Sequence, residues 1–211
     1  MAIDASVFDF NNGAHFEYLK TAYVLLIGAY QQQIKSSYDP EMQNENDIRN
    51  DLVKTAKNIK DTDLAISWIT EFPDLENKSR TDIALITPYN LGKEEEYIII
   101  ECKIVGEDKY IDNKKSFERE NPTNGIMSFI SGKYAQNMPL AGMIGFVKEG
   151  NIQSKIKNIR KRLTEHGDIK TIQNLIKYSI KENFKYSYQS IHERYNGVMG
   201  IEIYHLFFDY T

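Results

Sequence analysis

Residues Tyr97 to Val105 read YIIIECKIV, and this stretch decides the fold. Such an apolar run is typical of a strand inside a sheet that is covered on both faces. Glu101 and Lys103 interrupt the run, and buried charges are costly unless they are paired or bound to an ion. The two residues therefore either neutralise each other or form the reactive end of a site.

Alternation along this strand predicts that both charges share one face. Side chains of a strand point in turn to opposite faces, so Glu101 and Lys103 are neighbours on one side. Cys102 points the other way, toward the face of Ile98 and Ile100. We interpret Cys102 as a small core residue rather than a reactive thiol.

A third charged residue, Asp82, lies on the preceding strand. If the hairpin folds near Gly92, Asp82 comes level with residues 101–103, and directly paired residues of an antiparallel ladder share a face. Two carboxylates this close repel each other unless a divalent cation lies between them. Mg²⁺ suits such a place, because it prefers oxygen ligands and keeps waters and phosphate oxygens in its shell.

An acid on one strand followed by Glu-x-Lys on the next resembles the PD-(D/E)XK nuclease superfamily, whose fold is called restriction-endonuclease-like. The resemblance includes the order helix, three-strand meander, helix and strand, and it covers roughly residues 44–147. It implies that Asp82 and Glu101 bind Mg²⁺, for which Mn²⁺ can substitute. It also implies that Lys103 assists hydrolysis of a phosphodiester.

The first acid of the motif departs from the pattern. Thr81, not proline, precedes Asp82. A literal Pro-Asp exists at Pro73 and Asp74, but it lies in turn-like sequence and out of register with Glu101. We therefore prefer Asp82.

Many superfamily members also carry an acid on the helix before the meander. Glu45, four residues before Arg49, is our candidate for this catalytic position. Asp47 and Asp51 on the same predicted helix are the alternatives.

Hydrophobic periodicity predicts an order of helix, helix, three strands, helix, strand, helix and further strands. The expected helices cover residues 15–35, 44–59, 126–138 and 152–166, with a possible further helix at 171–182. The expected strands cover residues 64–72, 80–89, 96–105, 140–147, 186–195 and 199–210. This order predicts an α/β fold with a central mixed sheet flanked by helices.

We expect a single nuclease domain over residues 1–211. Residues 1–40 form an N-terminal helical extension, residues 44–147 the restriction-endonuclease-like core, and residues 148–211 a basic helix with C-terminal strands. The superfamily's helix after the meander often lends a polar residue to the site, which makes Lys133 a candidate phosphate contact. A solvated helix face is the alternative for Lys133.

Composition excludes several classes of protein. The chain has 211 residues, a formal net charge of −4 and one cysteine, so an internal disulfide is impossible and a cysteine zinc site is implausible. The four histidines show no metal-ligand spacing. The first residues lack the features of a signal peptide, and no apolar stretch is long enough to span a bilayer. We expect a cytoplasmic protein.

Basic residues gather on the predicted helix 152–166, although the chain as a whole is acidic. Its apolar stripe would be buried, which leaves Lys155, Lys161 and Arg162 on the other side as candidate substrate-binding residues. A basic face suits a phosphate backbone, and an ordinary solvated helix is the alternative.

These observations lead to the hypothesis of a Mg²⁺-dependent nuclease that acts on DNA. The superfamily suggests restriction or defence against phage, and cutting both strands would require a homodimer. One alternative is a non-catalytic nucleic-acid-binding or interaction protein that has kept the fold. Another is an RNA-directed nuclease.

Overall fold

A computed structural model describes residues 5–36, 44–59, 65–74, 79–93, 96–106, 109–112, 124–195 and 200–211. The four helices among these residues are α1 (Ala5–Lys35), α2 (Glu45–Asn58), α3 (Ile126–Ile130) and α4 (Ile152–Glu165). The strands are β1 (Ser67–Asp74), β2 (Ser79–Ile86), β3 (Ile98–Ile104), β4 (Leu140–Val147), β5 (Thr171–Lys177), β6 (Ser187–Glu193) and β7 (Gly200–Asp209). The predicted α/β class is confirmed.

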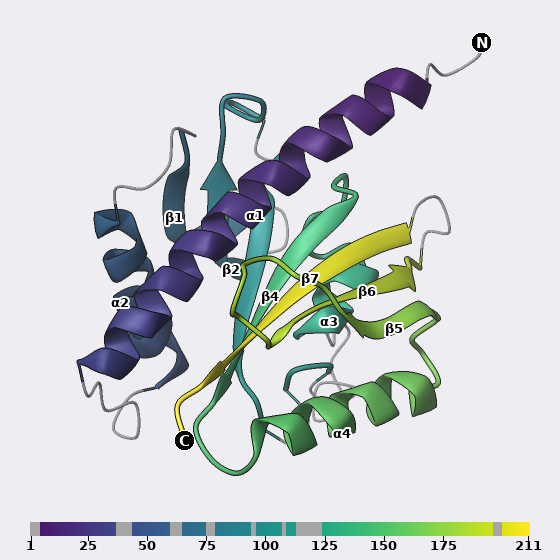
Figure 1. Cartoon of the computed structure of the whole chain (residues 1–211). Helices are drawn as coiled ribbons and strands as arrows, with labels where there is room; N and C mark the ends of the chain where they lie inside the picture. The colour runs from purple at the N-terminus through teal and green to yellow at the C-terminus, as the bar shows by residue number, and fades with distance from the viewer. Residues whose placement is uncertain are drawn as a thin grey trace.

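The seven strands form one mixed sheet in the order β1-β2-β3-β4-β7-β6-β5 (Figure 1). Its centre is parallel, because β3 pairs with β4 and β4 with β7 in the same direction. The flanks are antiparallel, with β1 and β2 on one side and β6 and β5 on the other. The strand with the two charges, β3, therefore lies inside the sheet.

Helix α1 crosses one face of the sheet diagonally, with α2 packed against it (Figure 1). The Tyr23 hydroxyl on α1 donates a hydrogen bond to the Tyr204 carbonyl oxygen of β7 at 2.7 Å. A Cβ atom at Gly142 of β4 would lie 2.6 Å from that hydroxyl and 2.8 Å from the Ile100 side chain. This close approach of helix and sheet requires glycine on β4.

Helix α4 covers the opposite face. The guanidinium group of Arg160 on α4 lies 5.9 Å from the ring centroid of Tyr188 on β6. Tyr188 pairs with His205 of β7. His205 in turn pairs with Met143 of β4, and Met143 pairs with Glu101 of β3. Residues paired across strands share a face. Glu101 and α4 are therefore on the same side of the sheet.

The predicted helix at residues 126–138 is wrong beyond its first turn. The helix ends at Ile130. Gly132 and Ala135 have backbone φ angles of +77° and +53°, a left-handed conformation that interrupts a right-handed helix. Lys133 consequently lies in an irregular segment and not on a helix.

The possible helix at residues 171–182 is also wrong. Residues Thr171–Lys177 form β5, which pairs with β6 at the edge of the sheet through an irregular register. The apolar spacing of Ile172, Leu175 and Ile176 fits a helical period, but β-branched residues also suit a strand, and pairing with β6 decides between them.

The remaining elements lie close to their predicted positions, and β4 has the predicted bounds. Helix α1 is longer than expected at its N-terminal end, where it begins at Ala5. The C-terminal end of this helix at Lys35 is as predicted. Residues 107–108 and 113–123 lie outside the described residues. No helix in the described part of the chain is both long and apolar enough to cross a bilayer.

Candidate active site

The site forms where β2 and β3 separate. Strands β1 and β2 remain paired as far as Asp74 and Ser79, whereas the β2–β3 ladder ends at Ile83 and Ile100. Beyond that point, alternate backbone N–H groups of β3 have no β2 carbonyl to bond. Buried N–H groups need another acceptor, so the notch between the strands must supply one.

Two predicted acids supply these acceptors. The Cys102 N–H donates to Oδ2 of Asp82 at 2.7 Å, and the Ile104 N–H donates to Oε2 of Glu45 at 2.8 Å. Asp82 reaches the notch from β2, and Glu45 reaches it from the first turn of α2. The carboxylates thus replace the missing strand, which fixes both of them beside β3.

Lys103 lies at the centre of the cluster. Its Nζ atom is 2.8 Å from Oε1 of Glu101, 3.1 Å from Oε1 of Glu45 and 3.4 Å from Oδ2 of Asp82. It also donates a hydrogen bond to the Cys102 carbonyl oxygen at 2.6 Å. The structure therefore brings together Asp82, Glu101, Lys103 and Glu45, the four residues that the sequence nominated as catalytic.

Burial and mutual charge control the protonation of this cluster. Glu101 is 3% exposed and Lys103 is 8% exposed. Burial and the neighbouring Asp82 carboxylate raise the pKa of Glu101 well above its usual range. Burial alone would lower the pKa of Lys103, but Glu101, Asp82 and Glu45 outweigh it and raise the pKa. Lys103 therefore stays an ammonium at all ordinary pH values.

The carboxyl group of Glu101 is only partly hydrogen-bonded. Its Oε1 atom contacts Lys103, but its buried Oε2 atom has no hydrogen-bond partner among the described residues. The carboxyl group lies within hydrogen-bonding reach of Asp82, another acid. Buried polar atoms are nearly always bonded. A protonated Glu101 can donate a hydrogen bond to Asp82, whereas an ionised Glu101 beside that carboxylate needs a cation between the two acids.

Local structure explains why Glu45 rather than Asp47 reaches the cluster. Asn44 begins α2 with a capping box, in which its side chain accepts the Asp47 N–H and the Asp47 side chain accepts the Asn44 N–H. Asp47 is thereby committed to the helix end. Asp51 lies further along the helix and is half-buried.

Arg49 is a site residue that sequence reasoning missed. It is 2% exposed and donates hydrogen bonds from Nη1 to Asp82 at 2.7 Å and from Nη2 to Glu71 at 3.0 Å. A signal was present, because Arg49 occupies a position of the buried stripe of α2, three residues before Leu52. A cation at a core position predicts a buried acid facing it.

Glu71 is the second missed residue. It lies opposite Asp82 in the β1–β2 register and has a left-handed backbone φ of +55°, which is strained for a residue with a side chain. Its carboxylate links Arg49 to the exposed Arg80. No pattern in the sequence predicts this backbone conformation.

The register of the strands favours Asp82 over the literal Pro-Asp pair. Asp74 pairs with Ser79 at the end of the β1–β2 ladder, on the strand that forms the sheet edge. Asp82 lies one position beyond the Ile83–Ile100 pair and so comes level with Glu101. Glu101 and Lys103 contact each other on β3, which lies inside the sheet.

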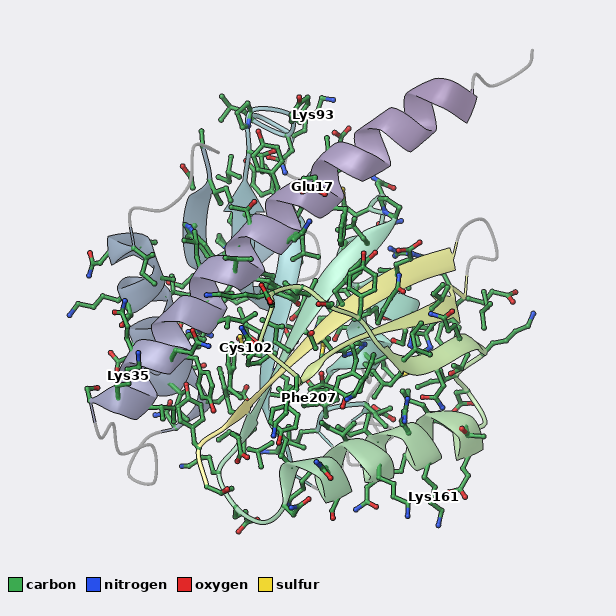
Figure 2. All side chains as sticks on the ribbon, in the orientation of Figure 1. Glu17, Lys35, Lys93, Cys102, Lys161 and Phe207 are labelled. Atoms are coloured by element: carbon green, nitrogen blue, oxygen red, sulfur yellow. The ribbon has the colours of Figure 1, made fainter. Side chains whose placement is uncertain are left out.

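The predicted substrate-binding residues lie in two places. The Nζ atom of Lys133 is 4.9 Å from the ring centroid of Tyr134, whose hydroxyl donates to the Arg80 carbonyl oxygen near Asp82. Lys155, Lys161 and Arg162 are on α4, beside the segment that follows β3. Cys102, labelled in Figure 2, is fully buried, and burial raises the pKa of its thiol, in keeping with a core residue.

A metal ligand set of three or more histidine, cysteine or acidic side chains is absent from the residues that the structure describes. The cluster instead offers the two carboxylates of Asp82 and Glu101. Mg²⁺ commonly takes only one or two carboxylates and keeps its waters, so the donor set suits this ion. The orphaned oxygen of Glu101 supports the same fit.

No protein-family model, curated protein or solved structure matches the chain. The arguments for function therefore come from the geometry of the site.

Proposed function

We propose that the cluster beside β3 is the active site of a Mg²⁺-dependent nuclease of the PD-(D/E)XK, restriction-endonuclease-like type. The observation that carries this proposal is a pair of close acids: the buried Oε2 atom of Glu101 has no donor among the described residues, and the carboxyl group lies within hydrogen-bonding reach of Asp82. A purely structural ion pair is stable only when its remaining lone pairs are satisfied. Glu101 retains an uncompensated acceptor in the place where a cation would be needed.

Asp82 and Glu101 would hold the metal, and the Cys102 carbonyl oxygen offers a further hard ligand in the same notch, since it already contacts the Lys103 ammonium. The bound cation would lower the pKa of a water molecule and stabilise negative charge on the phosphate. Loading the site also requires Glu101 to be ionised, which its raised pKa opposes at low pH.

Lys103 would act as a fixed cation. Because its pKa is raised, it cannot serve as a general base, but it can orient the attacking water and stabilise charge on a phosphate oxygen. A water molecule would add to phosphorus and release one proton to solvent, the bond from phosphorus to the leaving ester oxygen would break, and that oxygen would take up a proton from solvent. Lys103 remains charged throughout this exchange.

Two side chains from α2 would position the catalytic residues. Glu45 holds Lys103 through one oxygen and the backbone of β3 through the other. Arg49 holds Asp82 through Oδ1 and leaves Oδ2 directed at β3. Lys103 and Asp82 are thus each fixed by a side chain of α2, which keeps their geometry ready for the transition state.

DNA is the substrate that this proposal names, and restriction or phage defence is the role suggested by the nuclease type. One cluster cuts one strand. Cleavage of both strands of a duplex would therefore use a homodimer.

A cleavage assay tests the proposal. Plasmid, linear duplex, single-stranded DNA and RNA are incubated with the parent protein, with Mg²⁺, with Mn²⁺ or with a chelator. We expect metal-dependent cleavage of DNA, which Lys103→Ala abolishes while the fold persists. The matched control is Lys157→Ala on the exposed side of α4, which should cut like the parent.

Two results would contradict the proposal. The first is equal cleavage by the parent and Lys103→Ala, which would indicate a contaminating nuclease. The second is no cleavage of any substrate in either metal, which would favour the non-catalytic alternative. Cleavage of RNA alone would keep the mechanism and change the substrate.

A further inference from the structure

A hollow of about 490 Å³ lies between α4 and the segment that follows β3. Val105 and Gly106 form one wall, and residues of α4 form the other. Val105 is two residues beyond Lys103, a separation of about 7 Å along a strand. The hollow therefore begins beside the proposed active site, on the face of the sheet that Glu101 and α4 share.

The α4 wall carries a concentration of positive charge. Its ionised side chains are Lys155, Lys161, Arg162 and Glu165, three cations against one anion in a chain whose net charge is −4. Lys161 lies on the outer side of α4 (Figure 2) and forms the rim. A local cationic concavity in an acidic protein is a feature expected of an anion-binding site.

The ion pairs of these lysines are weak. Lys155 lies 3.9 Å from Glu149, which is 86% exposed, and Lys161 lies 3.9 Å from the exposed Glu165. Exposed pairs of this length contribute at most about 1 kcal/mol, so a phosphate can replace them. Arg160 differs, because its guanidinium donates to the Leu175 carbonyl oxygen and serves the contact between α4 and β5.

The size of the hollow identifies the occupant more closely. A volume of about 490 Å³ is in the range of small-ligand sites, whereas backbone contacts to a duplex need only a basic surface. Ser154 and Asn158 add neutral hydrogen-bonding groups between the cations. Phosphate, sugar and a base edge together match this combination of charge and amide groups.

We propose that this hollow binds one nucleotide of an unpaired nucleic-acid strand, with Lys155, Lys161 and Arg162 on its phosphates. The inference rests on the proposed function, and it makes single-stranded nucleic acid the substrate class next to the cut. No aromatic ring lines the hollow within the described residues, so electrostatics rather than base stacking supplies the affinity. Binding is therefore strongly salt-dependent.

Binding of a labelled 12-nucleotide single strand and of its duplex, measured in a chelator over a salt series, tests the proposal. The triple variant Lys155→Ala, Lys161→Ala, Arg162→Ala should bind the single strand at least about tenfold more weakly at low salt. Its slope of log affinity against log salt should flatten by about 2, because each phosphate that a cation neutralises contributes ~0.7 to the slope. The parent should prefer the single strand, and a nucleoside monophosphate should compete better than inorganic phosphate.

A charge-matched control replaces Lys157, Lys170 and Lys177 by alanine, all exposed and outside the hollow. It should bind like the parent, and the melting temperature of each variant verifies its fold. Overlapping isotherms for the two triple variants, or equal affinity of the parent for duplex, would overturn the proposal.

The assay also separates this inference from the proposed active site. Binding in a chelator measures occupation of the hollow without any turnover at the cluster around Lys103. Loss of binding in the hollow variant without any observed cleavage would leave the nucleotide site standing and reject the nuclease. Cleavage by the parent, together with unchanged single-strand binding in the hollow variant, would keep the nuclease and reject the nucleotide site.

Discussion

Two buried polar regions lie on one face of the same sheet, and they are built in opposite ways. The register places Glu101, Met143 and His205 side by side on β3, β4 and β7, so the buried Met143 separates the regions. On one side is the acid cluster around Lys103. On the other side is a chain of hydrogen bonds through two histidines.

The histidine chain is neutral and complete. Hydrogen bonds can run in one direction from Tyr110 to His205 at 2.9 Å, on to Ser190 at 2.8 Å and to His192 at 2.8 Å, and then through Thr171 to the Leu163 carbonyl oxygen. In this direction every hydrogen has an acceptor. Burial lowers the pKa of His192 to about 4 and that of His205 well below its usual range, so both rings are neutral.

The acid cluster is charged and incomplete. Glu45, Asp82 and Glu101 contact Lys103, Asp82 also contacts Arg49, and one oxygen of Glu101 lacks a donor among the described residues. A neutral, satisfied network stabilises a fold, whereas a charged network with an orphaned acceptor costs stability. The difference identifies the histidine chain as structural and favours the acid cluster as the functional site.

The largest expected change in stability concerns the support of the acid cluster. Arg49→Ala removes a buried guanidinium from Asp82, whose side chain is 13% exposed, and should lower the free energy of unfolding by about 3–5 kcal/mol. Arg80→Ala, which removes a side chain that is 70% exposed, should cost less than about 1 kcal/mol. Urea unfolding measures the free energy of unfolding of both variants. Similar small decreases in the two variants would contradict a stabilising role for the contact between Arg49 and Asp82.

The histidine chain should control stability on the acid side. The unfolded His192 takes up a proton near pH 6.5, but the folded ring does so only near pH 4. Stability is therefore lost as pH falls through this window, by roughly 2–3 kcal/mol for this residue. His192→Asn should flatten the dependence of unfolding free energy on pH between 6.5 and 4. Parallel curves for parent and variant would mean that His192 is protonated in the fold.

Glu101 should give a smaller effect of opposite sign. Its folded pKa lies above the ordinary value of 4.5, so the proton is held more tightly in the folded state, and stability falls as pH rises through the raised pKa. Without divalent metal, Glu101→Gln should therefore be more stable than the parent at pH 8–9 by about 1 kcal/mol, or roughly 2–4 °C in melting temperature. A destabilised variant across the whole pH range would contradict this assignment.

The sequence predicted the parts of the molecule in which local pattern and burial agree. Asp82, Glu101 and Lys103 were nominated because charges inside apolar strands are conspicuous, and Glu45 because the superfamily resemblance implies an acid on the helix before the meander. Arg49 was missed because it reads as part of an amphipathic helix until its buried partners are known. Glu71 was missed because its left-handed backbone has no local signature.

The errors in secondary structure have physical causes of the same kind. The segment after Ile130 has helical apolar spacing, but Arg194 donates hydrogen bonds to the carbonyl oxygens of Phe129, Ala135 and Met138, which holds it in an irregular shape. Residues 171–177 form strand β5 because they pair with the backbone of β6. Both outcomes depend on residues distant in the sequence, which single-sequence patterns do not contain.

Calorimetric titration of the metal-free protein with Mn²⁺ tests the central claim most directly, because it needs no knowledge of the substrate. We expect a single site whose affinity rises with pH as Glu101 loses its proton. Glu101→Gln should abolish the binding while remaining folded, and Ser190→Ala, in the histidine chain, should retain it. Equal binding by the Glu101 variant and the parent, or no binding by the parent at pH 8, would contradict a metal site at this cluster.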